Sequence, residues 1–299
     1  MSSSNISHVV LQSSSNHHNM PVIGFGTAST SPIDTKEAIL EAIKLGYRHF
    51  DTASIYGSEK PLGEAIAEAL QLGLIASRDE LFITSKLWCT DNFPNLVLPA
   101  IHKTLQCLKL EYLDLYLIHW PISVNPGTLD FPFPEEALAS FDLKGVWQAM
   151  EECQKQGLTK FIGVSNFSCH KLENLLSFAT IPPSVNQKLR EFCQKKGIIV
   201  TAYSPLGSVG SFWGSNKVMD NELLKQIGKA HGKSVAQVSL RWLYELGVIT
   251  VVKSYNKKRM KQNLEIFDWS LTKNDYEKID KIKQSRTFNF GPKLWDEED

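Results

Sequence analysis

Apolar residues recur along the chain in short runs rich in Val, Ile, Leu and Tyr, and each run is followed by a stretch with helical periodicity. The alternation of short strands with helices is typical of parallel β-α-β units. Eight such units favour closure into a (β/α)8 TIM barrel, an α/β fold, within a single domain of residues 1–299. The predicted strands are 22–26, 47–51, 81–85, 113–118, 161–164, 184–187, 198–202 and 248–252.

Helix signals fill the intervals between the strands. Asp34 and Glu37 have the spacing of a capping box at the start of the first helix, and Ser234 with Gln237 repeats it later. The segments 8–12 and 20–23 predict a β-hairpin that closes the barrel floor. The predicted helices are 34–45, 58–72, 96–108, 143–156, 168–178, 189–196, 220–231, 234–246 and 257–266.

A doubly wound sheet is the alternative to the barrel. The first strand–helix junction carries Gly24 and Gly26 but lacks the third glycine of a dinucleotide-binding fingerprint, which favours the barrel. The connection from Trp120 to Asp142 contains four prolines. A connection of that length in a compact domain is usually functional or disordered.

The balance of charge and the cysteine content limit the partners and the compartment. The chain has 32 Lys and Arg against 32 Asp and Glu, so no basic excess indicates nucleic-acid binding or a polybasic membrane contact. No apolar run approaches the roughly 20 residues of a membrane span, and residues 1–20 lack the apolar core of a signal peptide. The five cysteines form no C-x-x-C pair, and we expect reduced thiols in a cytoplasmic protein.

Polar side chains follow the predicted strands at the end of the barrel where active sites form. Asp51 ends the second strand, Lys86 directly follows the third, and His119 directly follows the fourth. Tyr56 comes shortly after Asp51. The later strands end at Ser165, Asn166, Gln187, Tyr203, Ser204, Lys253 and Ser254.

Each of the first four residues also has a purely structural interpretation. Asp51 and Lys86 can form a structural ion pair, His119 can be a core histidine, and Tyr56 can be an ordinary aromatic side chain. Yet a lysine beside a buried strand is costly to desolvate without a partner, and Asp51 is the nearest candidate. A cation next to a tyrosine favours the phenolate and lowers the pKa from about 10. The group suits protonation of an oxygen on which negative charge develops, and no cluster has the spacing of a metal site.

The last predicted strand leads into a basic helix. Arg259, Gln262 and Asn263 are spaced to share one face of this helix. A helix N-terminus with Lys253, Ser254 and Arg259 nearby can bind a phosphate. A solvated basic helix is the alternative, because three more lysines lie in the same segment.

Four motifs resemble one known family, the aldo-keto reductases. The resemblance extends from about residue 20 to residue 286, and it is closest to a plant branch that includes chalcone (polyketide) reductase, methylecgonone reductase and codeinone reductase. The matching motifs are 46–53 (GYRHFDTA) with Tyr56, Glu59 and Gly63, then 117–121 (LIHWP), 163–167 (GVSNF), and 252–254 (VKS) with Arg259.

The resemblance implies NADPH-dependent reduction of a ketone or aldehyde to an alcohol, on a polyketide- or alkaloid-type carbonyl of plant specialised metabolism. It implies that Tyr56 is the general acid, that Lys86 lowers the pKa of Tyr56, and that Asp51 pairs with Lys86. His119 would orient the carbonyl group. The implied substrate-binding residues are Tyr56, Trp88, His119 and Trp120.

The resemblance also implies NADP(H) as the cofactor, a small-molecule carbonyl compound as the only partner, a monomer, and no metal. Ser165, Asn166 and Gln187 would bind the nicotinamide carboxamide, and Tyr203 would stack on its ring. Lys253, Ser254 and Arg259 would hold the 2′-phosphate. The implied cofactor-binding residues are Thr27, Asp51, Ser165, Asn166, Gln187, Tyr203, Ser204, Leu206, Lys253, Ser254, Arg259, Gln262 and Asn263.

Two departures from the family pattern stand out. The sixth helical pattern begins directly after Gln187, where the family has a further loop, so the strand must shorten or the helix must unwind at its start. Only 13 residues follow Arg286, so the C-terminal substrate loop is expected to be trimmed. These departures leave an alternative function, a catalytically impaired or non-catalytic barrel.

Overall fold

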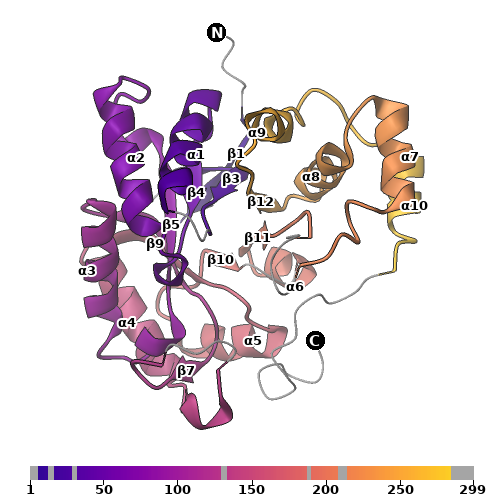
Figure 1. The fold of residues 1–299 in the computed structure, drawn as a ribbon. Coiled ribbons are helices and arrows are strands. Elements are labelled where there is room, and N and C mark those ends of the chain that lie inside the picture. The colour runs from indigo at the N-terminus through magenta and orange to yellow at the C-terminus, as the bar shows by residue number, and fades with distance from the viewer. Residues whose placement is uncertain are drawn as a thin grey trace.

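Eight parallel strands close into a barrel in the computed structural model, which describes residues 6–12, 17–28, 32–128, 133–186, 190–207 and 214–283 (Figure 1). The order around the barrel is β3-β4-β5-β6-β9-β10-β11-β12, with β12 pairing back to β3. The predicted barrel is therefore confirmed over the doubly wound alternative. The barrel strands are β3 (Ile23–Gly26), β4 (His49–Asp51), β5 (Phe82–Leu87), β6 (Leu113–Ile118), β9 (Thr159–Val164), β10 (Val185–Asn186), β11 (Ile199–Tyr203) and β12 (Ile249–Val252).

Helices cover the outside of the barrel, with α1 to α3 along one side of the view and α7, α8 and α10 along the other (Figure 1). The apolar faces of most helices form one core with the outward-facing strand residues, whereas α7 and α10 pack with part of α8 in a separate cluster. No described helix is long and apolar enough to cross a membrane. The helices are α1 (Pro32–Leu45), α2 (Glu59–Gln71), α3 (Val97–Leu108), α4 (Leu143–Lys155), α5 (Cys169–Phe178), α6 (Arg190–Lys195), α7 (Glu222–His231), α8 (Val235–Glu245), α9 (Lys257–Leu264) and α10 (Lys273–Ile279).

The capping predictions have mixed outcomes. Ser234 and Gln237 form the predicted capping box at the start of α8. The capping box predicted at Asp34 is wrong, because α1 already begins at Pro32; proline is favoured in a first helical turn, where its missing N–H costs nothing. The helix α10, which Thr272 caps, lies outside the predicted set of helices.

The two elements on either side of residues 187–189, the strand β10 and the helix α6, are both short. β10 has only two residues and meets β9 through the single pair Asn186 and Val164. α6 begins at Arg190, one residue later than predicted. The expected adjustment at this junction concerns residues 187–189, which lie outside the described residues, so it stays a prediction. Gln187 itself lies outside the described residues, as does the C-terminal segment 284–299 that was expected to be trimmed.

The predicted hairpin closes the barrel floor. β1 (His8–Gln12) pairs antiparallel with β2 (His17–Pro21). Leu11 and Met20 are each 1% exposed and pack against the inward-facing Phe82 at the start of β5. The hairpin thus removes the lower ends of the strands from solvent.

Asp114 on β6 joins the hairpin to the strands. The carboxylate is fully buried and faces the His18 ring at 3.2 Å and two cations, Arg78 at 2.7 Å and Lys160 at 3.2 Å. The backbone N–H of Ile83 donates to it at 2.8 Å. The His18 contact and these charges hold the pKa of Asp114 below its usual value despite burial. The ionised carboxylate therefore links segments that are far apart in the sequence.

We predict that Asp114→Asn lowers the free energy of unfolding by about 3 kcal/mol, because the cations of Arg78 and Lys160 then face a neutral amide in a buried position. Because the pKa of Asp114 is lower in the folded than in the unfolded state, the carboxylate stabilises the fold fully at pH values above the unfolded-state pKa of about 3.9. This stabilisation is lost as the pH falls through the folded-state pKa. Urea unfolding between pH 3 and 7 should therefore show that the free energy of unfolding falls less steeply toward acid pH in the variant than in the wild type. The exposed Asp268→Asn is the control, and equal stability curves for the two variants would contradict the assignment.

Candidate active site

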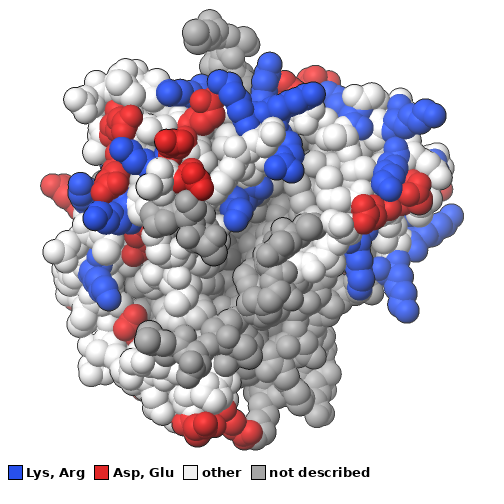
Figure 2. Space-filling view, in the orientation of Figure 1, with Lys and Arg blue, Asp and Glu red and all other residues white. Residues whose placement is uncertain are grey.

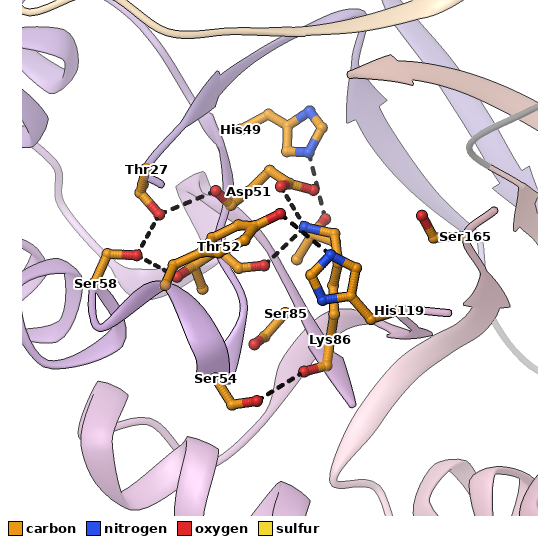
Figure 3. A network of polar contacts seen from close by, with 12 residues as sticks. Thr27, His49, Asp51, Thr52, Ser54, Ser58, Ser85, Lys86, His119 and Ser165 are labelled. Atoms are coloured by element: carbon orange, nitrogen blue, oxygen red, sulfur yellow. Dashed lines mark hydrogen bonds and ion pairs between the residues drawn. The ribbon is translucent and has the colours of Figure 1, made fainter. Parts of the chain in front are cut away.

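A buried ion pair lies at the C-terminal ends of the strands, where the polar residues were predicted to meet (Figure 3). Lys86 Nζ donates to Asp51 Oδ1 at 2.5 Å and to the carbonyl oxygen of Thr52 at 2.9 Å. Asp51 is 4% exposed and Lys86 is 1% exposed. Because neither charge reaches water, each depends on the other for its solvation.

Tyr56 lies directly against this pair. It ends the 3-10 turn Ser54–Tyr56, and Gly57 follows with a φ of 65°, a left-handed conformation that glycine adopts without strain. The Lys86 ammonium lies 5.0 Å from the centre of the Tyr56 ring. The Tyr56 hydroxyl is 3.3 Å from Nε2 of His119, which directly follows β6. The four residues predicted at separate strand ends therefore form one cluster.

The protonation states of the cluster differ in one respect from the prediction. Burial, and next the charge of Asp51, raise the pKa of Tyr56 above its usual value. The expected lowering of the Tyr56 pKa by Lys86 is wrong, because burial and the charge of Asp51 outweigh the effect of the ammonium. Burial, and next the charge of Lys86, lower the pKa of His119 well below its usual value. Tyr56 is thus a neutral hydroxyl beside a neutral imidazole.

Three hydroxyl groups fix the turn that carries Tyr56. Ser58 Oγ lies 2.8 Å from Thr27 Oγ1 and 2.9 Å from Thr52 Oγ1, and Thr27 also donates to the carbonyl oxygen of Asp51 at 3.1 Å (Figure 3). Thr27 was expected to contact a cofactor. Its hydroxyl is fully buried in this chain of hydrogen bonds, so its observed partners are protein groups.

Ser165 and Asn166 directly follow β9, and Figure 3 shows Ser165 on the other side of His119 from Ser58. Asn166 has a φ of 63°, which is uncommon for a residue other than glycine. Its Nδ2 donates to the carbonyl oxygen of His119 at 2.9 Å and to Ser165 Oγ at 3.0 Å. Its Oδ1 accepts from the Tyr203 hydroxyl at 2.9 Å. The hydrogen bond to Asn166 holds Tyr203 by its hydroxyl, yet 41% of the residue remains exposed. The Tyr203 ring can therefore serve as a platform on which another flat ring stacks.

A cationic surface lies next to this platform. Figure 2 shows Lys and Arg side chains gathered over α9, above the hollow at the centre of this face. Lys253 and Arg259 are exposed, and Lys253 Nζ donates to the carbonyl oxygen of Ala28 at 2.7 Å. Ser254, at the end of β12, is partly buried beside them. The positive charges and the N-terminus of α9 together suit a phosphate group.

The remaining predicted cofactor residues have different surroundings. Asn263 is 4% exposed and its side chain bonds the Tyr47 hydroxyl, whereas Gln262 on the same helix is partly exposed. Ser204 has a left-handed φ of 51° after β11, and Leu206 packs against the core. Gln187 lies outside the described residues.

Aromatic side chains form a wall beside His119. The Trp88 ring centre lies 5.1 Å from the His119 ring, and Trp120 stacks on His119 at 6.3 Å and 25°. Phe133, which the sequence analysis did not single out, lies 5.8 Å from Trp88. Both predicted tryptophans are therefore next to the tyrosine–histidine pair.

Asn92 anchors this wall and was also missed, because a lone asparagine in a connection carries no sequence signal. It is 1% exposed, and its Nδ2 donates to the carbonyl oxygens of Trp120 at 3.0 Å and Ile122 at 2.7 Å. Ser123 Oγ donates back to the Asn92 carbonyl oxygen at 2.6 Å. The long connection after Trp120 is thus fixed at its base. Its short strands β7 (Ser123–Val124) and β8 (Leu138–Ala139) pair with each other.

Comparisons with known proteins identify one family for this chain. The sequence profile of the Aldo/keto reductase family matches residues 22–284. NAD(P)H-dependent 6'-deoxychalcone synthase of Glycine max is 59% identical, with 97% of each chain covered. That alignment spans 307 positions, more than the 299 residues of this chain, so the relative has internal residues without a counterpart here. NADPH-dependent codeinone reductase 1-4 of Papaver somniferum is 55% identical over 94% of this chain and 95% of its own length.

A solved structure shows the same architecture. The crystal structure of a Bombyx mori aldo-keto reductase in complex with NADP superposes with a TM-score of 0.84 at 34% identity. It covers 95% of this chain and 96% of its own. Among the described residues, no group of three or more His, Cys, Asp or Glu side chains could hold a metal ion.

We predict that Asn92→Ala loosens the aromatic wall, because two partly buried carbonyl oxygens lose their donor at a cost of up to about 1–3 kcal/mol each. Amide hydrogen exchange of β7 and β8 should accelerate about tenfold or more, while exchange in β5 and β6 stays slow. Asn125→Ala is the matched control, since its amide donates only at the exposed rim of the same segment. Equal exchange in the two variants would show that Asn92 does not anchor the wall.

Proposed function

The chain belongs to the aldo/keto reductase family, and from that premise we propose which residues carry its reaction and which substrates it takes. It is an NADP-dependent oxidoreductase that acts on carbonyl groups. The observation that carries the assignment of residues is the buried Asp51–Lys86 pair with Tyr56 and His119 against it. The alternative of a non-catalytic barrel is not favoured, because these groups meet despite the short connection after β10.

Tyr56 is the general acid of the proposed reaction. Its raised pKa keeps the hydroxyl protonated at neutral pH, so it can donate to a carbonyl oxygen as negative charge develops there. The neutral His119 imidazole lies 3.3 Å away and orients the same oxygen. When the proton leaves, Lys86 stabilises the resulting phenolate, and Asp51 holds Lys86 in place.

Most of the proposed cofactor-binding residues lie at the mouth of the barrel, on the segments from the end of β9 to α9. NADPH, when bound, supplies the hydride. The exposed ring of Tyr203 fits the flat nicotinamide, with Ser165 and Asn166 beside it. Arg259 and Lys253 would bind the 2′-phosphate through charge-assisted hydrogen bonds, which favours NADPH over NADH. The proposed set of cofactor-binding residues is completed by Ser254, Ser204, Leu206, Gln262, Asn263, Thr27, Asp51 and Gln187.

We propose a bulky, ring-containing ketone or aldehyde of plant specialised metabolism as the substrate. The relatives' names refer to a chalcone and to codeinone, both of them carbonyl compounds. Trp88 and Trp120 lie against His119, so they offer flat apolar surface at the reacting position. A cytosolic monomer built as one domain of residues 1–299 is the proposed setting.

We predict that Tyr56→Phe lowers kcat by at least about 100-fold, the smaller of the usual contributions of a general acid, and leaves the Kd for NADPH nearly unchanged. The reason is that the variant removes the donor hydroxyl but none of the proposed cofactor contacts. Stopped-flow or steady-state kinetics with a panel of aromatic ketones, and fluorescence titration with NADPH, measure the two quantities. Tyr112→Phe removes a hydroxyl at the opposite end of the barrel and serves as the control. A Tyr56→Phe enzyme with most of its kcat would overturn the assignment.

We predict that Arg259→Ala weakens NADPH binding by roughly 10- to 100-fold, because a hydrogen bond to a charged group contributes about 1.5–3 kcal/mol. NADH lacks the 2′-phosphate, so its Kd should change little. Isothermal titration with both cofactors gives the ratio. Lys229→Ala, an exposed cation on α7, controls for the loss of one positive charge. Equal losses for NADPH and NADH would assign Arg259 another role.

A further inference from the structure

A second buried carboxylate lies behind strand β5, outside the four residues of the proposed mechanism. Glu59, in the first turn of α2, is 6% exposed. Ser85 Oγ donates to its Oε1 at 2.7 Å, and the Thr104 side chain on α3 also bonds it. No ion pair of the described residues includes Glu59. An ionisable group buried without a direct counter-charge is costly, so its position calls for a physical reason.

Glu59 connects the two segments that carry Tyr56 and Lys86. It lies in the helical turn that follows Tyr56, and its partner Ser85 immediately precedes Lys86 on β5. Ser54, in the turn of Tyr56, adds a second link by donating to the Lys86 carbonyl oxygen at 3.3 Å. The separation between the ammonium and the tyrosine ring therefore depends on these bonds, which join β5 to α2 and to the turn of Tyr56.

The same carboxylate also acts on the charge of Lys86. Successive side chains of a strand point to opposite faces, so Ser85 and Glu59 lie outside the barrel wall while Lys86 points into the mouth. Burial lowers the pKa of Lys86, and the negative charges of Asp51 and then Glu59 oppose that effect. The other titratable groups around the ammonium are His49 on β4, Tyr56 and His119.

We propose that Glu59 is a positioning residue for the reduction, which keeps Lys86 in its ammonium form and fixes β5 relative to the turn of Tyr56. This inference rests on the proposed function of Tyr56 and Lys86. Glu59 works from outside the barrel and touches neither substrate nor cofactor. Burial raises the pKa of Glu59 itself, with Lys103 and Lys86 as the nearby opposing charges, so its contribution is lost at acid pH.

The test is Glu59→Gln in the full-length enzyme, because glutamine removes the charge and keeps one oxygen that accepts from Ser85, while its amide NH2 can donate to the Thr104 hydroxyl. Without the negative charge of Glu59 the Lys86 ammonium is less stable, so Lys86 loses its proton at a lower pH. The decline of kcat at alkaline pH, the alkaline limb of the profile, should therefore move to lower pH by roughly 1 unit. The Kd for NADPH and the Tm at neutral pH should stay within error of the wild type. NMR titration of 13C-labelled lysines should show the same shift for Lys86, assigned by its loss in Lys86→Met, without any need for turnover.

Two further variants separate charge from geometry. Ser85→Ala removes the hydrogen bond but leaves the charge, so kcat should fall several-fold while the alkaline limb stays in place. Glu68→Gln removes a carboxylate from the same helix at its surface ion pair with Lys36, and we expect a wild-type profile. If Glu59→Gln does not fold, Glu59→Asp takes its place, because aspartate keeps the charge on a shorter side chain. Glu59→Asp and Ser85→Ala should then both lower kcat and leave the alkaline limb in place.

An unshifted alkaline limb and an unshifted Lys86 titration in Glu59→Gln would overturn the proposal. A fall in Tm alone, with both titrations unchanged, would give Glu59 a purely structural role and would overturn it as well. Failure of the proposed function looks different, because the wild-type enzyme would then reduce no carbonyl compound with NADPH, whatever the state of Glu59.

Discussion

The ion pair between Asp51 and Lys86 is the constraint on which the mouth of the barrel depends. Two opposite charges lie almost completely out of water, a state that is unfavourable unless each charge is paired and hydrogen-bonded. The pair meets this requirement through the contact between the two side chains and through the Thr52 carbonyl oxygen. The hydroxyl chain of Thr27, Ser58 and Thr52 then holds the backbone on which these acceptors lie.

The protonation states of the neighbouring residues follow from this pair. Because Asp51 balances Lys86, the net field at Tyr56 does not favour a phenolate, and burial keeps the hydroxyl protonated. Burial and the same ammonium keep the His119 imidazole neutral. The cluster therefore rests in the form that a proton donor needs, and Lys86 acts most strongly once negative charge appears on the tyrosine.

The two ends of the barrel use charge for different purposes. At the floor, Asp114 faces two cations, the His18 ring and a backbone donor, and these contacts keep the carboxylate ionised and the hairpin attached. At the mouth, one cation and one anion balance each other beside an exposed ring and a cationic helix start. This division agrees with the general rule that barrel floors stabilise the fold while barrel mouths carry the chemistry.

The sequence by itself determined the eight strands, the barrel, the floor hairpin and the convergence of Asp51, Tyr56, Lys86 and His119. These features follow from local periodicity and from the rule that parallel strands end at one face, and both can be read along the chain. The tertiary structure alone decided the raised pKa of Tyr56, the burial of Asn263 against Tyr47, and the anchoring of the aromatic wall by Asn92. Each of these depends on which distant segments exclude water from a group and which partner they leave for it, and no local pattern encodes that.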